Sequence, residues 1–333
     1  MKKLLDYLTS SDNLKNYLKL TYPQISYDDD VFLIMGKYHL SSLYKSAPKM
    51  YKFYTIPKRN GGRRAIAHPS KKLKVTQRDL STYLEKILPV HDCAFAYRKN
   101  KSIKDNALIH VGNKFLLKMD LVNFFNSITP KMLINEIKES DLSFEESELD
   151  YIKKLAFWCP SKEDNGKLIL SVGAPSSPLL SNFIMYRFDS VLSEVAKSNK
   201  VKYSRYADDI FLSTNVPNVL KLFVNIVKII LKEMYHDELI INEMKTVFSS
   251  KAHNRHVTGI TITNDNKISL GRQNKRMISS LVHKYSLGVL DTSKIIRLRG
   301  LISFASSIEP DFIIRLENKY TFNLINKLIK GLD

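Results

Sequence analysis

The chain has 333 residues, 44% of them hydrophobic, and its 52 Lys and Arg against 33 Asp and Glu give a formal net charge of +19. This length and apolar content predict two or three compact parts and exclude wholesale disorder. The charge excess is larger than solubility needs. Because Tyr and Phe are interleaved with it, we interpret it as the footprint of a nucleic acid rather than as a generally basic surface.

Cysteine usage argues against a disulfide-stapled protein, and hydropathy argues against a membrane-spanning one. The two cysteines, Cys93 and Cys159, lack the spacing of a metal site or of a disulfide framework, which predicts buried thiols in a reducing compartment. The N-terminal run reaches Asp6 before a signal-type apolar core develops, and no run approaches the ~18 apolar residues of a membrane span. We therefore expect a cytoplasmic protein without membrane contact.

The first seventy residues change from helical patterning to a basic hairpin. Residues 1–50 space their leucines as a helix does, so we expect a helical N-terminal extension. Residues 51–56 and 63–67 read as strands on either side of Asn60-Gly61-Gly62, which is a hairpin turn signal. Four basic side chains surround the turn, either as a solvated edge or as a grip for phosphate: Lys58, Arg59, Arg63 and Arg64.

A polar pentapeptide precedes the first buried strand. A helix is expected over residues 71–90, and Asn106-Ala-Leu-Ile-His110 follows it. Alone, this pentapeptide is most simply a helix with an ordinary hydrogen-bonding His. Residues 115–119 predict a short buried strand that ends at Asp120, with Phe125 five positions beyond.

A shaped loop lies near the middle of the chain. Residues 131–168 read as helix, loop and polar turn, and Ser171–Pro178 then leads into an apolar helix. Gly173 and two prolines give this loop a backbone that can lie against a base pair or a template strand, where a bulky side chain would not fit. A plain helix-entry turn, with Pro178 near the first helical position, is the alternative.

Two adjacent carboxylates occupy the tip of a second predicted hairpin. Tyr203–Tyr206 and Ile210–Leu212 favour strands, so Asp208 and Asp209 fall at the turn. Neighbouring like charges stay ionised only when something positive lies between them, and Mg²⁺ suits hard carboxylate oxygens. Asp is also a common turn residue. A third acid, Asp120, favours a metal site over a simple polar turn, because carboxylates at neighbouring strand ends can share a metal pair.

The C-terminal third combines apolar helices with basic residues. Residues 217–235 predict an amphipathic helix, and residues 257–270 a third strand pair. His253 and His256 have no third ligand nearby in the sequence, so we expect phosphate contact rather than metal binding. Residues 273–333 predict a helical region whose basic surface includes Arg272, Lys275, Arg276, Lys284, Arg297 and Arg299.

Several of these segments resemble a known family. Asp120, Gly173–Pro178 and Tyr206–Asp209 are similar to the cores of motifs A, B and C of reverse transcriptases and occur in that family's order. Asn106–His110 and Val257-Thr258-Gly259 resemble regions X and Y of retron reverse transcriptases. The resemblance implies an α+β right-hand polymerase with an antiparallel palm sheet. Its parts would be an N-terminal helical extension (1–50), fingers (51–105, with part of 131–170), palm (106–130 and 171–270) and helical thumb (271–333).

The resemblance also implies roles for individual residues. Asp120, Asp208 and Asp209, with the backbone of Leu121, would hold two Mg²⁺ ions, for which Mn²⁺ can substitute. Lys245, in a segment similar to motif D, would protonate the leaving pyrophosphate, although a solvated lysine is the alternative. The implied nucleotide contacts are Lys58 and Arg64 at the triphosphate, Phe125 as a steric gate against a ribose 2′-hydroxyl, and Gly173 at the base pair. The implied RNA contacts are Asn106, His110, Val257, Thr258, Gly259, Arg272, Lys275 and Arg276.

A retron-type enzyme implies a particular reaction and set of partners. It would use dNTPs to copy a cognate structured non-coding RNA into multicopy single-stranded DNA (msDNA), starting from a 2′-hydroxyl of that RNA, within an antiviral (anti-phage) complex. Nothing in the chain resembles a nuclease or toxin, so a separately encoded effector, such as an ATPase or nuclease, is the expected partner. The alternatives are a reverse transcriptase of group II intron or abortive-infection type, and a non-catalytic RNA-binding scaffold that restrains an effector.

Overall fold

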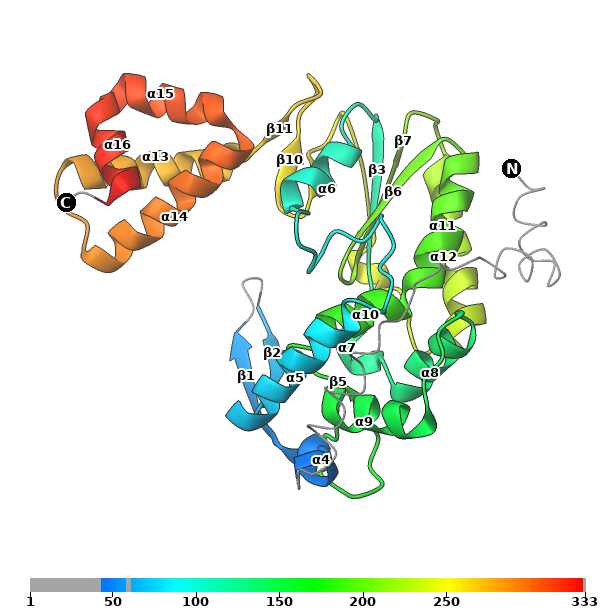
Figure 1. The fold of residues 1–333 in the computed structure, drawn as a ribbon. Coiled ribbons are helices and arrows are strands. Elements are labelled where there is room, and N and C mark those ends of the chain that lie inside the picture. Colours follow the sequence, from blue (N-terminus) through cyan, green and yellow to red (C-terminus); the bar gives the residue numbers. More distant parts are fainter. Residues whose placement is uncertain (1–42, 58–60, 332–333) are drawn as a thin grey trace. The chain divides into compact units, whose positions relative to one another are not determined.

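The computed structural model describes residues 43–57 and 61–331 (Figure 1). The helical extension expected for residues 1–50 therefore lies mostly outside the described residues, and so does Lys58. Within the described ranges, no helix is both long and apolar enough to cross a membrane. The two cysteines, Cys93 and Cys159, are free and buried, as the sequence predicts.

The described chain divides into two compact units. One comprises Leu117–Val247 and the described part of Met1–Asn100, and the other comprises Lys101–Leu116 and the described part of Phe248–Asp333. The segments predicted as palm, 106–130 and 171–270, are thus each shared between the two units.

The first unit contains the predicted basic hairpin. β1 (Tyr51–Pro57) pairs antiparallel with β2 (Arg63–Pro69) along its whole length, from Tyr51↔Pro69 to Pro57↔Arg63. The Ser70 hydroxyl then accepts from the Leu73 N–H and so caps α5 (Lys71–Leu84). Around these elements are α4 (Leu43–Ser46), the short 3₁₀ helix η1 (Ala47–Lys49), α8 (Pro130–Lys138), α9 (Glu146–Ala156), β4 (Phe157–Trp158) and β5 (Ile169–Leu170).

A four-stranded sheet of order β6-β7-β3-β8 carries the acidic residues. β6 (Val201–Tyr206) and β7 (Asp209–Thr214) form the predicted antiparallel hairpin, with Tyr206 opposite Asp209. β3 (Phe115–Asp120) lies beside β7, and β8 (Val247–Ser250) lies beside β3. Three shorter elements also belong to the first unit: α7 (Phe124–Ser127), α10 (Ser177–Ile184) and the 3₁₀ helix η2 (Glu243–Lys245).

Two helices cover the acid-bearing hairpin. α11 (Tyr186–Ser198) packs on β6 and α12 (Val219–Tyr235) on β7, and the two helices lie side by side (Figure 1). The predicted amphipathic pattern of α12 is confirmed, because Phe223, Val227 and Ile230 are buried while its lysines are exposed. This apolar packing holds both strands of the hairpin from one side.

The second unit has its own small sheet and a set of helices. β9 (Arg255–Val257), β10 (Ile260–Ile262) and β11 (Ile268–Ser269) form a sheet of order β11-β10-β9. α6 (Ile103–Ile109) packs on β9 and β10. The predicted helical C-terminal region is confirmed as α13 (Arg272–Ser286), α14 (Thr292–Ile308), α15 (Pro310–Tyr320) and α16 (Phe322–Lys330).

Candidate active site

The three predicted acids lie at adjacent strand ends. Asp120 is the last residue of β3 and Asp209 the first of β7, and these strands are neighbours. The backbone N–H of Leu121 donates to the carbonyl of Asp208 at 3.0 Å. Residues distant along the chain are therefore joined directly at the point where the carboxylates emerge.

The carboxylates act on one another electrostatically. Burial and the neighbouring charge of Asp209 raise the pKa of Asp208, and Asp120 raises it further. Burial also raises the pKa of Asp209, again with a contribution from Asp120 that the Lys118 ammonium opposes. Clustered negative charge of this kind favours binding of a cation.

Two lysines contact the acids directly. Lys118 Nζ lies 2.8 Å from Asp209 Oδ1, and Lys245 Nζ lies 2.9 Å from Asp120 Oδ1. The backbone N–H of Asn242 donates to the Asp120 carbonyl at 2.7 Å, which places the segment carrying Lys245 beside the acids. Lys118 was not predicted from the sequence, although strand alternation places it on the same face of β3 as Asp120.

The donor set fits a divalent cation, although the side chains are not arranged around one. In the part of the chain that the structure describes, no group of three or more His, Cys, Asp or Glu side chains is placed to hold a metal ion. Instead, ammonium groups already lie within 3 Å of Asp120 and Asp209. Hard carboxylate oxygens are the ligands that Mg²⁺ prefers, and the two ammonium groups now supply the positive charge that a bound cation would supply.

Phe125 forms an aromatic pair with a residue that was not predicted from the sequence. Phe124 is buried, whereas Phe125 is only partly buried, which distinguishes Phe125 from a core residue. Its ring centroid lies 6.2 Å from that of Tyr97. Tyr97 is 56% exposed, and its backbone is left-handed with φ of 62°, an unusual conformation for a bulky residue.

Tyr97 also lies within electrostatic reach of two predicted site residues. Burial raises the pKa of Tyr97, Asp208 raises it further, and Arg64 lowers it. Arg64 is exposed in β2, opposite Ile56. The predicted gate thus contacts this tyrosine, and the predicted phosphate contact and one of the acids both act on its pKa.

Gly173 lies against the hairpin of its own chain. The Ala67 N–H donates to the Val172 carbonyl at 3.3 Å, and the Ser171 hydroxyl donates to the Ala67 carbonyl. Gly173 has φ of 125°, and a Cβ there would lie 3.4 Å from the Ala67 oxygen. The close approach that the structure shows is to β2, while contact with a base pair stays a prediction.

Three of the predicted RNA contacts in regions X and Y have buried side chains. Asn106 is 0% exposed, His110 1% and Val257 0%, so none of these side chains can contact RNA in this arrangement. Burial lowers the pKa of His110 to about 3, which makes the imidazole neutral. The Thr258 hydroxyl donates to the Ile103 carbonyl at 3.3 Å. The two regions therefore pack together and form part of the core of the second unit.

The other predicted RNA contacts of this unit lie at the turn between β9 and β10 and at the start of α13. Val257 pairs with Ile260, so Thr258 and Gly259, both with positive φ, form a two-residue turn. Arg272 and Arg276 are exposed, whereas Lys275 is engaged by Glu309 at 3.0 Å. A cavity of about 630 Å³ lies beside the start of α13; its basic lining residues are Lys251, His253, His256, Arg272 and Lys275.

Comparison with known proteins shows the family to which the chain belongs. Residues 56–262 match the family described as reverse transcriptase (RNA-dependent DNA polymerase). Retron Ec83 reverse transcriptase of Escherichia coli is 49% identical, with 86% of this chain and 93% of the relative aligned. Retron Ec73 reverse transcriptase, also of Escherichia coli, is 33% identical, with 86% and 92% aligned. Among solved structures, telomerase from Candida albicans with a TWJ fragment of telomeric RNA gives a TM-score of 0.48 at 14% identity, covering 97% of this chain and 70% of that one.

The adjacent acids and the family match together define the class of protein: the chain belongs to the reverse transcriptases, RNA-dependent DNA polymerases that use divalent metal ions. Within that class it is a retron reverse transcriptase, because the Ec83 and Ec73 retron enzymes align with it over 93% and 92% of their own length.

Proposed function

We propose that this enzyme makes msDNA. It copies a cognate structured non-coding RNA from a 2′-hydroxyl within that RNA, and it acts in an anti-phage defence complex with a separately encoded effector. The observation that carries the proposal is the direct backbone contact between Leu121 and Asp208, which joins the predicted motifs A and C. The 49% identity to the Ec83 enzyme supports the choice of retron chemistry.

The proposed metal ligands are Asp120, Asp208, Asp209 and the backbone carbonyl of Leu121. Two Mg²⁺ ions bound there would supply activation of the priming hydroxyl and charge neutralisation at the leaving pyrophosphate. Ligation requires Asp120 and Asp209 to exchange their lysine partners for metal. Lys245, once released from Asp120, is then free to donate its proton to pyrophosphate.

The proposed nucleotide site uses residues around Tyr97. Arg64, together with Lys58, holds the triphosphate, because guanidinium groups bind phosphate oxygens in pairs. Phe125 crowds the 2′ position of the sugar, and Gly173 keeps the loop before α10 close to β2. In the second unit, Thr258, Gly259, Arg272, Lys275 and Arg276 are the proposed RNA-facing residues, and contacts there rely on phosphates and 2′-hydroxyls.

The test is to extract the nucleic acid that co-purifies with the protein expressed beside its native locus. We expect short DNA that is sensitive to DNase and covalently joined to RNA. An Asp208→Asn variant should retain the RNA and lose the DNA, while Asp141→Asn, at an exposed position, should retain both. Full DNA synthesis by the Asp208 variant would overturn the polymerase assignment. If the variant keeps its RNA but loses defence, the protein is not merely an RNA-binding scaffold.

A further inference from the structure

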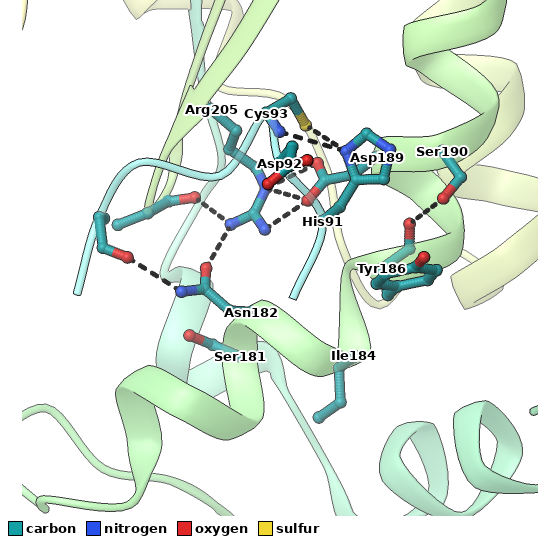
Figure 2. A network of polar contacts seen from close by, with 12 residues as sticks. His91, Asp92, Cys93, Ser181, Asn182, Ile184, Tyr186, Asp189, Ser190 and Arg205 are labelled. Carbon is teal, nitrogen blue, oxygen red and sulfur yellow. Dashed lines mark hydrogen bonds and ion pairs between the residues drawn. The ribbon is translucent and has the colours of Figure 1, made fainter. Parts of the chain in front are cut away.

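A buried ion pair contacts the turn between β6 and β7 that carries Asp208. Arg205 in β6 and Asp189 in α11 are both 0% exposed, and Arg205 Nη2 lies 2.6 Å from Asp189 Oδ2 (Figure 2). Arg205 Nε donates to Asp189 Oδ1 at 2.8 Å, and the Tyr203 hydroxyl donates to the same oxygen at 2.6 Å. Burial alone would lower the pKa of Arg205, but Asp189 raises it, so the guanidinium stays charged.

The guanidinium also holds the peptide that precedes Asp208. Arg205 Nη1 donates to the Ala207 carbonyl at 3.1 Å, and that carbonyl belongs to the peptide bond between Ala207 and Asp208. Ala207 is left-handed, with φ of 56°, a conformation that costs energy for any residue with a Cβ. The bond from Arg205 therefore fixes the strained peptide from which the predicted metal ligand projects.

A second arm of the cluster holds the peptide that precedes Tyr97. Asn182 in α10 accepts from Arg205 Nη1 at 3.2 Å through Oδ1, and its Nδ2 donates to the Ala96 carbonyl at 3.0 Å. The Arg205 backbone contacts the same segment, since its N–H donates to the Cys93 carbonyl and its carbonyl accepts from Phe95, each at 2.8 Å. One amide side chain thus joins the guanidinium to the loop that presents Tyr97 to Phe125.

Stabilisation of the fold does not by itself explain why these polar groups are buried here. The desolvation of a buried ion pair offsets much of its attraction, and apolar side chains of similar volume often serve as well. Here the polar groups are directed at two backbone carbonyls, one preceding Asp208 and one preceding Tyr97. Fixed orientation is what a catalytic site requires of its supporting residues.

We propose that Arg205, Asp189 and Asn182 are positioning residues for polymerisation: the arm to Ala207 orients Asp208 for cation binding, and the arm to Ala96 orients Tyr97 against the sugar gate Phe125. The inference rests on the proposed function of these site residues. None of the three touches substrate. Their effects are separable because each arm ends at a different carbonyl.

The first arm is tested with Arg205→Lys, which keeps a positive charge beside Asp189 but lacks the fork that reaches Ala207 and Asn182 together. Titration of the full-length, nucleic-acid-free protein with Mn²⁺, followed by electron paramagnetic resonance, should show affinity lowered by about 10- to 100-fold. The control is Arg187→Lys. Arg187, on α11, also pairs with carboxylates, at 3.1 Å from Glu136 and 2.9 Å from Glu139. Its substitution should lower the melting temperature without changing Mn²⁺ affinity.

Unchanged Mn²⁺ affinity in Arg205→Lys would overturn the first arm. If that variant does not fold, Tyr203→Phe removes one bond to Asp189 while keeping the ring, and its affinity must fall in the same direction. Asp208→Asn separates this result from the proposed function. If the parent protein binds Mn²⁺ independently of Asp208, the metal assignment fails; if binding depends on Asp208 but not on Arg205, only the positioning role fails.

The second arm is tested with Asn182→Asp, which keeps an acceptor for Arg205 and removes the donor to Ala96. We expect near-parental Mn²⁺ affinity with a roughly tenfold loss of discrimination between dNTPs and rNTPs, measured as the ratio of kcat/KM values. Parental discrimination in this variant would overturn the second arm.

Discussion

The ammonium group of Lys245 lies 2.9 and 3.0 Å from the two carboxylate oxygens of Asp120. A single lysine thus balances the charge of one proposed metal ligand while it is also the candidate general acid. The two roles compete, because Lys245 must release Asp120 before a cation can bind there.

Substitution of Lys245 is therefore expected to have opposite effects on binding and chemistry. Lys245→Gln frees Asp120 of its ammonium partner, so Mn²⁺ affinity should increase, while loss of a general acid should lower kcat by about 10²-fold or more. Single-nucleotide extension on a primed RNA template and Mn²⁺ titration measure the two quantities. A parallel decrease of both would contradict this account.

Lys118 is expected to set the acid limit of activity. The pKa of Asp209 is raised by burial, and Lys118 opposes the increase. Lys118→Met should therefore raise that pKa further and move the acid limb of the pH–kcat profile to higher pH, since the carboxylate must be ionised to hold a cation. Lys202→Met, an exposed substitution in β6, serves as the control and should leave the profile in place.

Asp208→Asn should stabilise the protein in the absence of metal and nucleic acid. Because the folded-state pKa of Asp208 is raised, the folded state binds its proton more tightly than the unfolded chain does. Stability is therefore lost as pH rises from the usual Asp value through the raised one. At neutral pH the variant should gain about 0.5–2 kcal/mol in free energy of unfolding. The gain should disappear in acid, and Mg²⁺ should stabilise only the parent.

Two glycines give opposite expectations for the same substitution. Gly173→Ala forces a Cβ into a backbone of φ 125° beside the Ala67 oxygen, and should cost more than about 1 kcal/mol and reduce extension activity. Gly300 lies inside α14, where an added Cβ would have no atom within 4 Å, so Gly300→Ala should stabilise by up to ~1 kcal/mol. Denaturant unfolding of both variants measures the difference.

Exposed and buried residues of the second unit should respond differently when RNA binding is measured. Arg276→Gln should weaken RNA binding and reduce the slope of log affinity against log salt by about 1, as expected for one phosphate contact. His110→Gln should lower the melting temperature but leave that slope unchanged, because the imidazole is buried and neutral. An altered slope in the His110 variant would restore the RNA contact predicted from sequence.

Local pattern determined much of this protein. The hairpin that ends at Asp208 and Asp209, the strand that ends at Asp120 and the basic β1–β2 hairpin follow from strand-forming residues and turn residues close together in sequence. The residues at Asp120, Gly173–Pro178 and Tyr206–Asp209 resemble motifs A, B and C, and their order along the chain agrees with that of reverse transcriptases.

Only the tertiary structure decided which side chains meet and which are buried. Lys118 pairs with Asp209, and Tyr97 meets Phe125, through strands and loops that no local pattern connects. Asn106 and His110 belong to the core of the second unit because α6 packs on β9 and β10, although the resemblance to region X had implied RNA contact. Hydrophobic period reports the face that one element buries, but the partner across that face depends on packing between elements distant in sequence.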